Sequence, residues 1–171
     1  AVAVGQPESA ATWFPVNDHP SDKAAYTFTV AAPDGYEVVA NGRPRGTEPS
    51  LPGWTEWSWR AKAPMAPYLA TVGIGAWDVH RWRTDDGIPV YDAVDPAIGA
   101  AVRSAIDSSL AKQGEILDFL ADRIGRPYPF DTVGAIVDPE RPIAFALETQ
   151  TRPTYAAIFW IDRSGQPAEA D

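Results

Sequence analysis

The chain has 171 residues and a hydrophobic fraction of 45%, which is enough for the core of one ordinary domain or of two small ones. Its net charge of -9 argues against nucleic acid and anionic membrane surfaces as partners, because an acidic field attracts neither. The lack of cysteine excludes disulfides and thiolate zinc sites. It leaves the compartment open, extracellular or cell-envelope as well as cytoplasmic. No apolar run approaches the length of a membrane span.

The first half of the sequence has the pattern of short strands joined by Pro and Gly turns. Residues 26–30 alternate between apolar and polar side chains, and residues 54–62 alternate again. Asn41-Gly42, after the strand between them, is the strongest short hairpin signal in the chain. Residues 68–75 are more uniformly apolar, as expected of a central strand. These features predict an antiparallel sheet or sandwich.

The second half changes to a helical pattern followed by strands. Asp95-Pro96 has the form of an N-cap with Pro at the first helical position, and apolar side chains then recur every three or four residues. Gly125 is the expected end of this single long helix. Two strands are predicted behind it, at 132–137 and 143–147. This half therefore predicts a helix packed on a small sheet, the start of an α/β unit.

Few side chains belong to a recognisable catalytic motif. His19 and His80 are isolated, and there is no HExxH, GxSxG, phosphate loop or dinucleotide fingerprint. Two carboxylates stand out, Glu8 in the irregular stretch GQPES and Glu148 at the end of the apolar run IAFAL. Two acids that converge on one cleft would bind a primary ammonium group through charge-assisted hydrogen bonds. Spacing alone does not establish that these two meet.

The strand at 54–62 carries Trp57 and Trp59 on the same face. The opposite face is polar and supplies the solvent side, so a core position is the preferred interpretation for this pair. If the pair were exposed instead, it would offer a stacking surface to a carbohydrate or a peptide. The chain would then be a non-enzymatic β-rich binding module with an aromatic ligand platform.

The order of several motifs resembles the aminopeptidase N and leukotriene hydrolase family of zinc metallopeptidases. The family's Gln-x-Glu, Phe-Pro-x-x-Asp-x-Pro and Lys-Ala motifs are matched by GQPESAATWFPVNDHPSDKAAYTFTV, and its Pro-Met-x-x-Tyr-Leu strand by PMAPYLATVGIG. Its helix, Phe-Gly-x-x-Tyr-Pro turn and strand are matched by ILDFLADRIGRPYPFDTVGAIV. Its Gly-Ala-Met-Glu-Asn exopeptidase motif is matched by FALETQTRPTY, with Phe145 in place of the first Gly and Thr149 in place of Asn.

The resemblance implies an α+β fold in two parts. Residues 1–84 would be the later part of a β-sandwich-like N-terminal domain, and residues 85–171 the truncated opening segment of a thermolysin-like α/β catalytic domain. The HExxH motif would lie beyond Asp171, so zinc is expected in the parent protein and not in this chain. The start AVAVGQPESA, which lacks an initiator Met, and the acidic end PAEAD agree with a fragment.

The resemblance also implies roles for individual residues. Glu8 and Glu148 would clamp the free α-ammonium group of a peptide substrate, and Gln6 would shape the pocket for its first side chain. The backbone of Ala146 and Leu147 would pair with the extended peptide. The expected parent is a monomeric zinc aminopeptidase, and this chain alone, without a catalytic residue, is expected to be inactive. A relative that kept the scaffold and lost catalysis is a further alternative, which the two departures from the exopeptidase motif allow.

Overall fold

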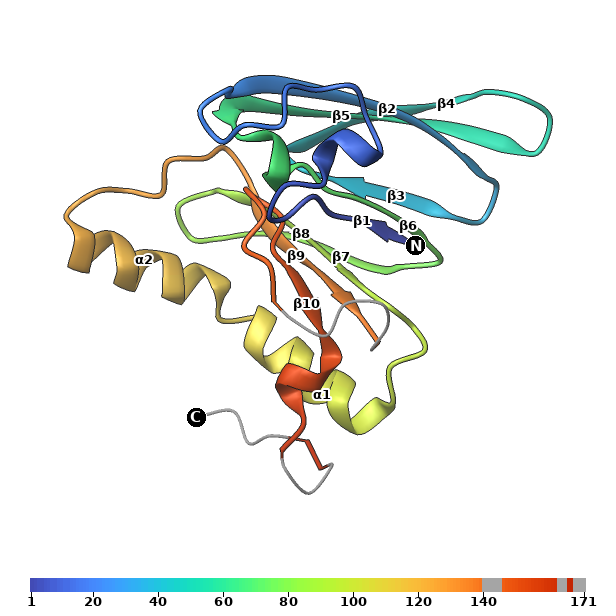
Figure 1. Ribbon diagram of the computed structural model, residues 1–171. Coiled ribbons are helices and arrows are strands. Elements are labelled where there is room, and N and C mark those ends of the chain that lie inside the picture. Colours follow the sequence, from blue (N-terminus) through green and yellow to red (C-terminus); the bar gives the residue numbers. More distant parts are fainter. Residues whose placement is uncertain (140–145, 163–165, 168–171) are drawn as a thin grey trace. The chain divides into compact units, whose positions relative to one another are not determined.

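The computed structural model describes residues 1–139, 146–162 and 166–167, and the chain forms two compact units (Figure 1). The first unit contains Ala1–Trp77 and Leu147–Pro153, and the second contains the rest. No pattern in the sequence predicts that Leu147–Pro153 returns to the first unit. The division into two family domains near residue 84 stays a prediction, because the two units are defined by packing alone.

The first unit contains two antiparallel sheets of three strands each among the described residues (Figure 1). This confirms the antiparallel β-rich first part. Two short 3-10 helices, η1 (Ala10–Thr12) and η2 (Pro67–Leu69), connect strands. The strands in spatial order are β1 (Val2–Ala3), β6 (Val72–Gly75) and β3 (Glu37–Ala40) in one sheet, and β2 (Ala24–Pro33), β5 (Trp54–Met65) and β4 (Arg43–Pro49) in the other.

The pairing of β2 with β5 follows from the alternation in both segments. Phe28 lies opposite Trp59, and Val30 lies opposite Trp57, so large apolar side chains share one face. Trp59 is fully buried, and its indole Nε1 donates a hydrogen bond to the carbonyl oxygen of Val38 over 3.0 Å. Trp57 is half-buried. The predicted core position is thus confirmed for Trp59 and met in part by Trp57.

The Asn41-Gly42 pair does not close a hairpin, so that prediction is wrong. The strand before it, β3, pairs with β6, whereas the strand after it, β4, pairs with β5 in the other sheet. Gly42 has a φ of 80°, and a Cβ at this position would lie 2.1 Å from the carbonyl oxygen of Arg60. The buried Asn41 side chain bonds to main-chain groups of three distant residues. The pair therefore marks a crossing between sheets, and its side-chain contacts override the local turn preference.

The second unit is built on a four-stranded mixed sheet (Figure 1). The outer pair β7 and β8 is antiparallel, whereas β8, β9 and β10 run parallel to one another. Parallel neighbours need a long connection, which the two helices between β8 and β9 provide. The α+β fold is confirmed. The strands in spatial order are β10 (Thr154–Ala156), β9 (Val133–Asp138), β8 (Pro89–Val94) and β7 (Asp78–Arg83), and a short 3-10 helix, η3 (Ala157–Trp160), follows β10.

The predicted long helix is two helices, α1 (Ala100–Leu110) and α2 (Gln113–Ile124). The expected start at Asp95 is also wrong, because the Asp95 carboxylate accepts the Ala97 N–H over 2.8 Å in a turn before the helix. The break falls next to Gly114, the weakest helix former of the periodic stretch. Gly125, with a φ of 72°, ends α2 as predicted.

The two helices differ in how much of their apolar stripe is covered. Ile106 of α1 is fully buried in a cluster with residues of β8, β9 and η3, which confirms a helix packed on a small sheet. By contrast α2 has no buried residue, and its Phe119 and Ile124 are 56% and 68% exposed. Neither helix, nor any other in the described part of the chain, is long and apolar enough to span a membrane.

Candidate functional site

The predicted strand that ends at Glu148 lies mostly outside the described residues, which resume at Ala146. From there the segment Leu147–Pro153 packs into the first unit through main-chain contacts. The carbonyl oxygen of Gln150 accepts a hydrogen bond from Asn41 Nδ2 over 2.7 Å, and the Gln150 side chain donates to the carbonyl oxygen of Ala63 over 3.3 Å. This segment is therefore anchored to residues that lie far away in the sequence.

Gly42 binds the same segment through both of its main-chain groups. Its N–H donates to Thr151 Oγ1 over 2.8 Å, and its carbonyl oxygen accepts from Arg152 Nη2 over 2.9 Å. Arg152 Nε also donates to the carbonyl oxygen of Ala40 over 3.3 Å. The guanidinium is fully buried and lies 5.5 Å from the centre of the Trp59 ring. A charged side chain thus ties the segment to the crossing between the two sheets.

A tight turn inside the segment sets the position of Thr149. The Arg152 N–H donates to the Thr149 carbonyl oxygen over 3.0 Å, and Thr149 Oγ1 donates back to the Arg152 carbonyl oxygen. Thr151, between them, has a φ of 65°, a backbone conformation that β-branched residues rarely adopt. Thr149, which replaces the Asn of the resembling motif, therefore serves to close this turn.

Glu148 is exposed although both of its neighbours are buried. Leu147 is 2% exposed and Thr149 is wholly covered, so their side chains fix the chain on either side of the acid. Among the described residues the Glu148 carboxylate makes no hydrogen bond or ion pair. The fold thus presents a carboxylate to solvent from a segment that is itself firmly held.

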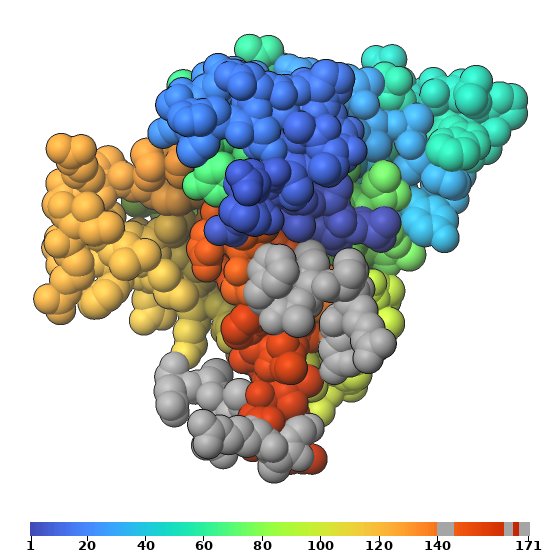
Figure 2. All heavy atoms as spheres, viewed as in Figure 1, coloured from blue at the N-terminus to red at the C-terminus, as the bar shows by residue number. Residues whose placement is uncertain are grey.

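Gln6 and Glu8 lie in a turn near the N-terminus, and both are exposed. The turn is closed by the Ser9 N–H, which donates to the Gly5 carbonyl oxygen over 2.9 Å. Gly5 is buried, and a Cβ there would lie 3.1 Å from the Ala10 Cβ, which explains a glycine at this position. The N-terminal stretch, dark blue in Figure 2, lies at the surface on the face shown.

The sequence places Glu8 and Glu148 in different halves of the chain, whereas both belong to the first compact unit. Within the described residues, no hydrogen bond joins them and neither forms an ion pair. The structure thus gives the two acids a common support. Their convergence on one substrate group stays a prediction.

The family resemblance implies that the backbone of Ala146 and Leu147 pairs with a peptide. The Leu147 carbonyl oxygen already accepts the Thr149 N–H over 2.9 Å, a short-range bond that turns the chain sharply at Glu148. A carbonyl oxygen has two lone pairs, so one direction is left for a second donor. The pairing role therefore stays a prediction for both residues.

Aromatic side chains in the first unit pack edge to face and stack among themselves. The successive rings are separated by 4.5, 6.1 and 5.9 Å between centroids, and burial together with the charges of Asp22 and Asp18 raises the pKa of the Tyr26 hydroxyl. The full burial of Trp59 removes this residue from any ligand platform. The rings in this row belong to Trp13, Phe14, Tyr26 and Phe28.

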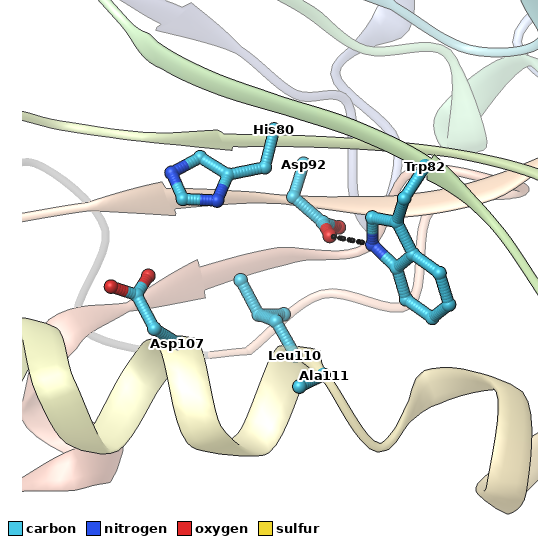
Figure 3. A pocket seen from close by; sticks show the side chains of 6 residues that line it. All are labelled: His80, Trp82, Asp92, Asp107, Leu110 and Ala111. Carbon is cyan, nitrogen blue, oxygen red and sulfur yellow. Dashed lines mark hydrogen bonds between the residues drawn. The ribbon is translucent and has the colours of Figure 1, made fainter.

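The second unit has a hollow of about 250 Å³ between β7, β8 and α1, which sequence reasoning missed (Figure 3). The 1% exposed carboxylate of Asp92 accepts hydrogen bonds from Gln113 Nε2 over 2.7 Å and from Trp82 Nε1 over 3.5 Å. The one available signal was an acid inside the apolar run PVYDAV. The lining residues are His80, Trp82, Asp92, Asp107, Leu110 and Ala111.

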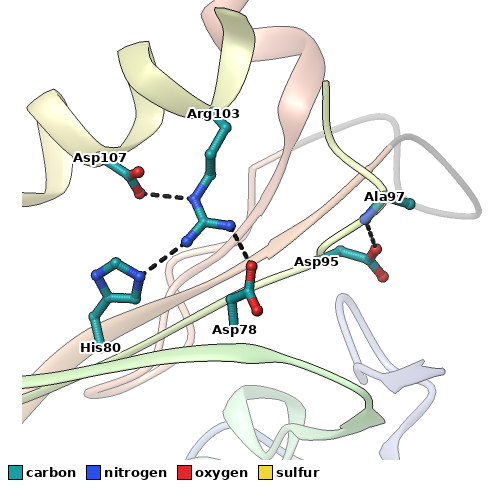
Figure 4. Close-up of polar contacts among 6 residues, drawn as sticks. All are labelled: Asp78, His80, Asp95, Ala97, Arg103 and Asp107. Atoms are coloured by element: carbon teal, nitrogen blue, oxygen red, sulfur yellow. Dashed lines mark hydrogen bonds and ion pairs between the residues drawn. The ribbon is translucent and has the colours of Figure 1, made fainter. Parts of the chain in front are cut away.

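Beside this hollow, Arg103 of α1 joins a polar cluster with three residues (Figure 4). It contacts the Asp78 and Asp107 carboxylates over 2.7 and 2.8 Å, and its Nη2 lies 2.9 Å from His80 Nε2. Burial lowers the pKa of Arg103, but the hydrogen bonds and charges of Asp107 and Asp78 outweigh it and leave the pKa raised. His80 is thus an exposed member of a surface network, in line with the sequence-based expectation.

The described residues offer few histidine side chains that could bind zinc. No group of three or more His, Asp or Glu side chains in that part of the chain is placed to hold a metal ion. His19 bonds to Ser21 Oγ over 2.7 Å, and His80 faces Arg103, a cation. These residues do not fit a zinc site.

Comparison with known proteins gives a family for the first unit. Residues 1–69 match the model described as the peptidase M1 N-terminal domain, a range that includes Gln6, Glu8 and five strands of the two sheets, β1 to β5. This match covers less than half of the chain and identifies its N-terminal part as similar to M1 peptidases. Together with the aminopeptidases found as similar proteins, this match confirms the family resemblance inferred from the motifs.

Similar proteins are aminopeptidases of vertebrates. The chain is 29% identical to glutamyl aminopeptidase from Bitis rhinoceros over 106 residues, 58% of this chain and 11% of the relative. It is 30% identical to aminopeptidase A from Gloydius brevicauda over 96 residues, 53% of this chain and 10% of the relative. It is 25% identical to glutamyl aminopeptidase from Sus scrofa over 136 residues, 79% of this chain and 14% of the relative. The chain thus spans little more than a tenth of the length of these relatives.

Proposed function

We propose that this chain supplies the substrate-recognition part of a zinc aminopeptidase that removes N-terminal residues from peptides. Glu148 and Glu8 bind the free α-ammonium group of the substrate, and Gln6 borders the space for its first side chain. The support comes from the M1 match over residues 1–69 and from aminopeptidases as relatives. The chain by itself performs no hydrolysis.

The observation that carries this proposal is the setting of Glu148. Its carboxylate is exposed and has no partner in the described part of the chain, while the residues on both sides are buried. The buried backbone on both sides fixes where this acid stands, and no cation among the described residues neutralises it. A primary ammonium group offers three donors to satisfy carboxylate oxygens, so the substrate amine complements this position.

The selectivity for free amines follows from the same chemistry. A peptide with a blocked N-terminus would leave desolvated carboxylates without a donor, which is costly once substrate covers them. The enzyme would therefore act at chain ends. The zinc ion belongs to the parent protein outside the described residues, where it would act as the Lewis acid of the reaction.

The test is a substitution in the full-length parent enzyme. Glu148→Gln keeps the shape of the side chain and removes its charge, so kcat/KM for an aminoacyl 4-nitroanilide should fall about 30-fold or more. The matched control is Glu48→Gln, an exposed acid on β4 of the same unit, which should stay within about twofold of wild type. Equal losses for the two variants would contradict the assignment of Glu148.

A further inference from the structure

We propose that Arg152 is the positioning residue for Glu148: its buried guanidinium holds the segment Leu147–Pro153 on the crossing between the two sheets, and so fixes the acid in space. The inference rests on the proposed function of Glu148. Arg152 itself does not touch the substrate in this scheme. It acts through Thr149 and through the main chain of the segment.

The geometry of the guanidinium suits this role better than that of another cation. Arg152 uses Nε and Nη2 to reach the carbonyl oxygens of Ala40 and Gly42, two residues apart on the same crossing. Its planar group also lies over the Trp59 ring. A lysine ammonium is a compact point charge without a planar group. It cannot both donate in the fixed geometry of a guanidinium and stack on an aromatic ring.

The crossing at Asn41 and Gly42, which accepts the bonds of Arg152, is as tightly constrained as the arginine. A Cβ at Gly42 would overlap the main chain of Arg60, so the crossing approaches β5 closely at this point. Both the N–H and the carbonyl oxygen of Gly42 are used by the segment, by Thr151 and Arg152 respectively. Asn41 adds a bond to the carbonyl oxygen of Gln150. Three successive residues of the segment are therefore bound to two successive residues of the crossing.

The connection from Arg152 to Glu148 is short and made of hydrogen bonds. The main chain of Arg152 exchanges two hydrogen bonds with Thr149, one to its carbonyl oxygen and one from its Oγ1. Thr149 is buried and adjacent to Glu148, and Leu147 is buried on the other side. Displacement of Arg152 must therefore move Thr149, and with it Glu148, which directly precedes Thr149 on the same backbone.

The test uses the full-length parent and a pair of substrates. The pair is an aminoacyl 4-nitroanilide and the acyl 4-nitroanilide that lacks only the α-amino group. The ratio of their kcat/KM values measures how strongly the enzyme recognises the amine. Where hydrolysis is too slow to measure, the ratio of the inhibition constants of the two corresponding amides is used in its place. Arg152→Lys should lower this ratio about tenfold or more, mainly through KM for the amine substrate.

A purely structural role would lower both rates alike and leave the ratio unchanged, which would overturn the proposal. Glu148→Gln separates this outcome from failure of the proposed function: it must strongly lower the preference for the amine whatever Arg152 does. In the double variant, Arg152→Lys should remove no further preference once Glu148 is replaced. An additive loss would also overturn the proposal.

Two further variants cover loss of folding and non-specific effects. If Arg152→Lys does not fold, Thr151→Val removes the acceptor for the Gly42 N–H with little change in shape, and it should lower the ratio a few-fold. An unchanged ratio for a folded Thr151→Val protein counts against the proposal. Arg45→Lys makes the same chemical change as Arg152→Lys at an exposed position of β4 and should leave the ratio at its wild-type value.

Discussion

Two arginines, one in each unit, are held in opposite ways. Arg152 is fully buried, binds main-chain carbonyl oxygens and lies over an aromatic ring. Arg103 keeps 17% of its side chain exposed and pairs with the side chains of Asp78 and Asp107, which are about half exposed. The first arginine fixes the path of a distant backbone segment. The second joins side chains that solvent and salt can replace.

The difference matters for the candidate site because Glu148 has no partner of its own in the described part of the chain. Its position depends on how well its backbone is held, and that backbone is held by main-chain bonds and Arg152. Substitutions in the two regions should therefore differ in size and in their response to salt.

The largest effect is expected at the crossing that receives Arg152. Gly42→Ala should lower the free energy of unfolding by about 4 kcal/mol, because it combines a left-handed φ with a Cβ placed 2.1 Å from a carbonyl oxygen. Gly35→Ala is the matched control: its φ of 88° is similar, but nothing lies within 4 Å of the added Cβ. It should cost about 1 kcal/mol. Urea denaturation measures both, and equal costs would show that the crossing is not tightly packed.

A smaller but still large effect is expected from removing the buried cation. Arg152→Met should cost about 3 kcal/mol, since the carbonyl oxygens of Ala40 and Gly42 would lose buried donors. Arg103→Met should cost less than about 1 kcal/mol, as expected for a partly exposed ion pair. The comparison between the two arginines fails if these two values, measured by the same denaturation experiment, are similar.

Salt should separate the two variants further. The Debye length shrinks from about 10 Å at 0.1 M to about 3 Å at 1 M salt, so exposed ion pairs are weakened. The difference between wild type and Arg103→Met should fall by roughly half in 1 M NaCl, whereas that for Arg152→Met should stay constant within about 0.3 kcal/mol. Thermal or urea unfolding at both salt concentrations provides the measurement. A salt-sensitive Arg152→Met difference would mean that solvent reaches this guanidinium.

The smallest expected effect concerns catalysis by the chain alone. Neither arginine region contains a fitting group of metal ligands, and the same holds for the other described residues. If the proposed function holds, the purified chain should release no product from an aminoacyl 4-nitroanilide above the background of the buffer. Product release that a chelator abolishes would show that this chain carries its own metal centre.

Most of the β-rich first half could be predicted from the sequence because its signals are local. The alternation in residues 26–30 and 54–62 is sufficient to place Phe28 against Trp59 once the strands pair. The Asn41-Gly42 signal failed for a physical reason: Asn41 makes long-range contacts and Gly42 closely approaches β5, and both outweigh the turn preference of the pair. The local pattern of one sequence does not distinguish a turn preference from such long-range contacts.

The sequence names the residues of the candidate site, whose roles stay a prediction, but it does not indicate the contacts that support them. Motif order singled out Glu8 and Glu148, yet no spacing rule indicates that TQTR after Glu148 reaches back to Asn41 and Gly42. The apolar stripe likewise predicts one helix where there are two, because Gly114 lowers helix propensity without interrupting the apolar pattern. Contacts over more than 100 residues are the part that local patterns do not encode.

The return of Leu147–Pro153 to the first unit also has a consequence for the order of folding. The bonds from Gly42 and Asn41 span 109 residues and that from Arg152 to Ala40 spans 112, so they rank among the least local contacts of the chain. During synthesis, the first sheets emerge long before the residues that complete them. The buried donors and acceptors of the first unit are therefore satisfied only after residues 147–153 have been made, which predicts slow, late consolidation of the region that presents Glu148.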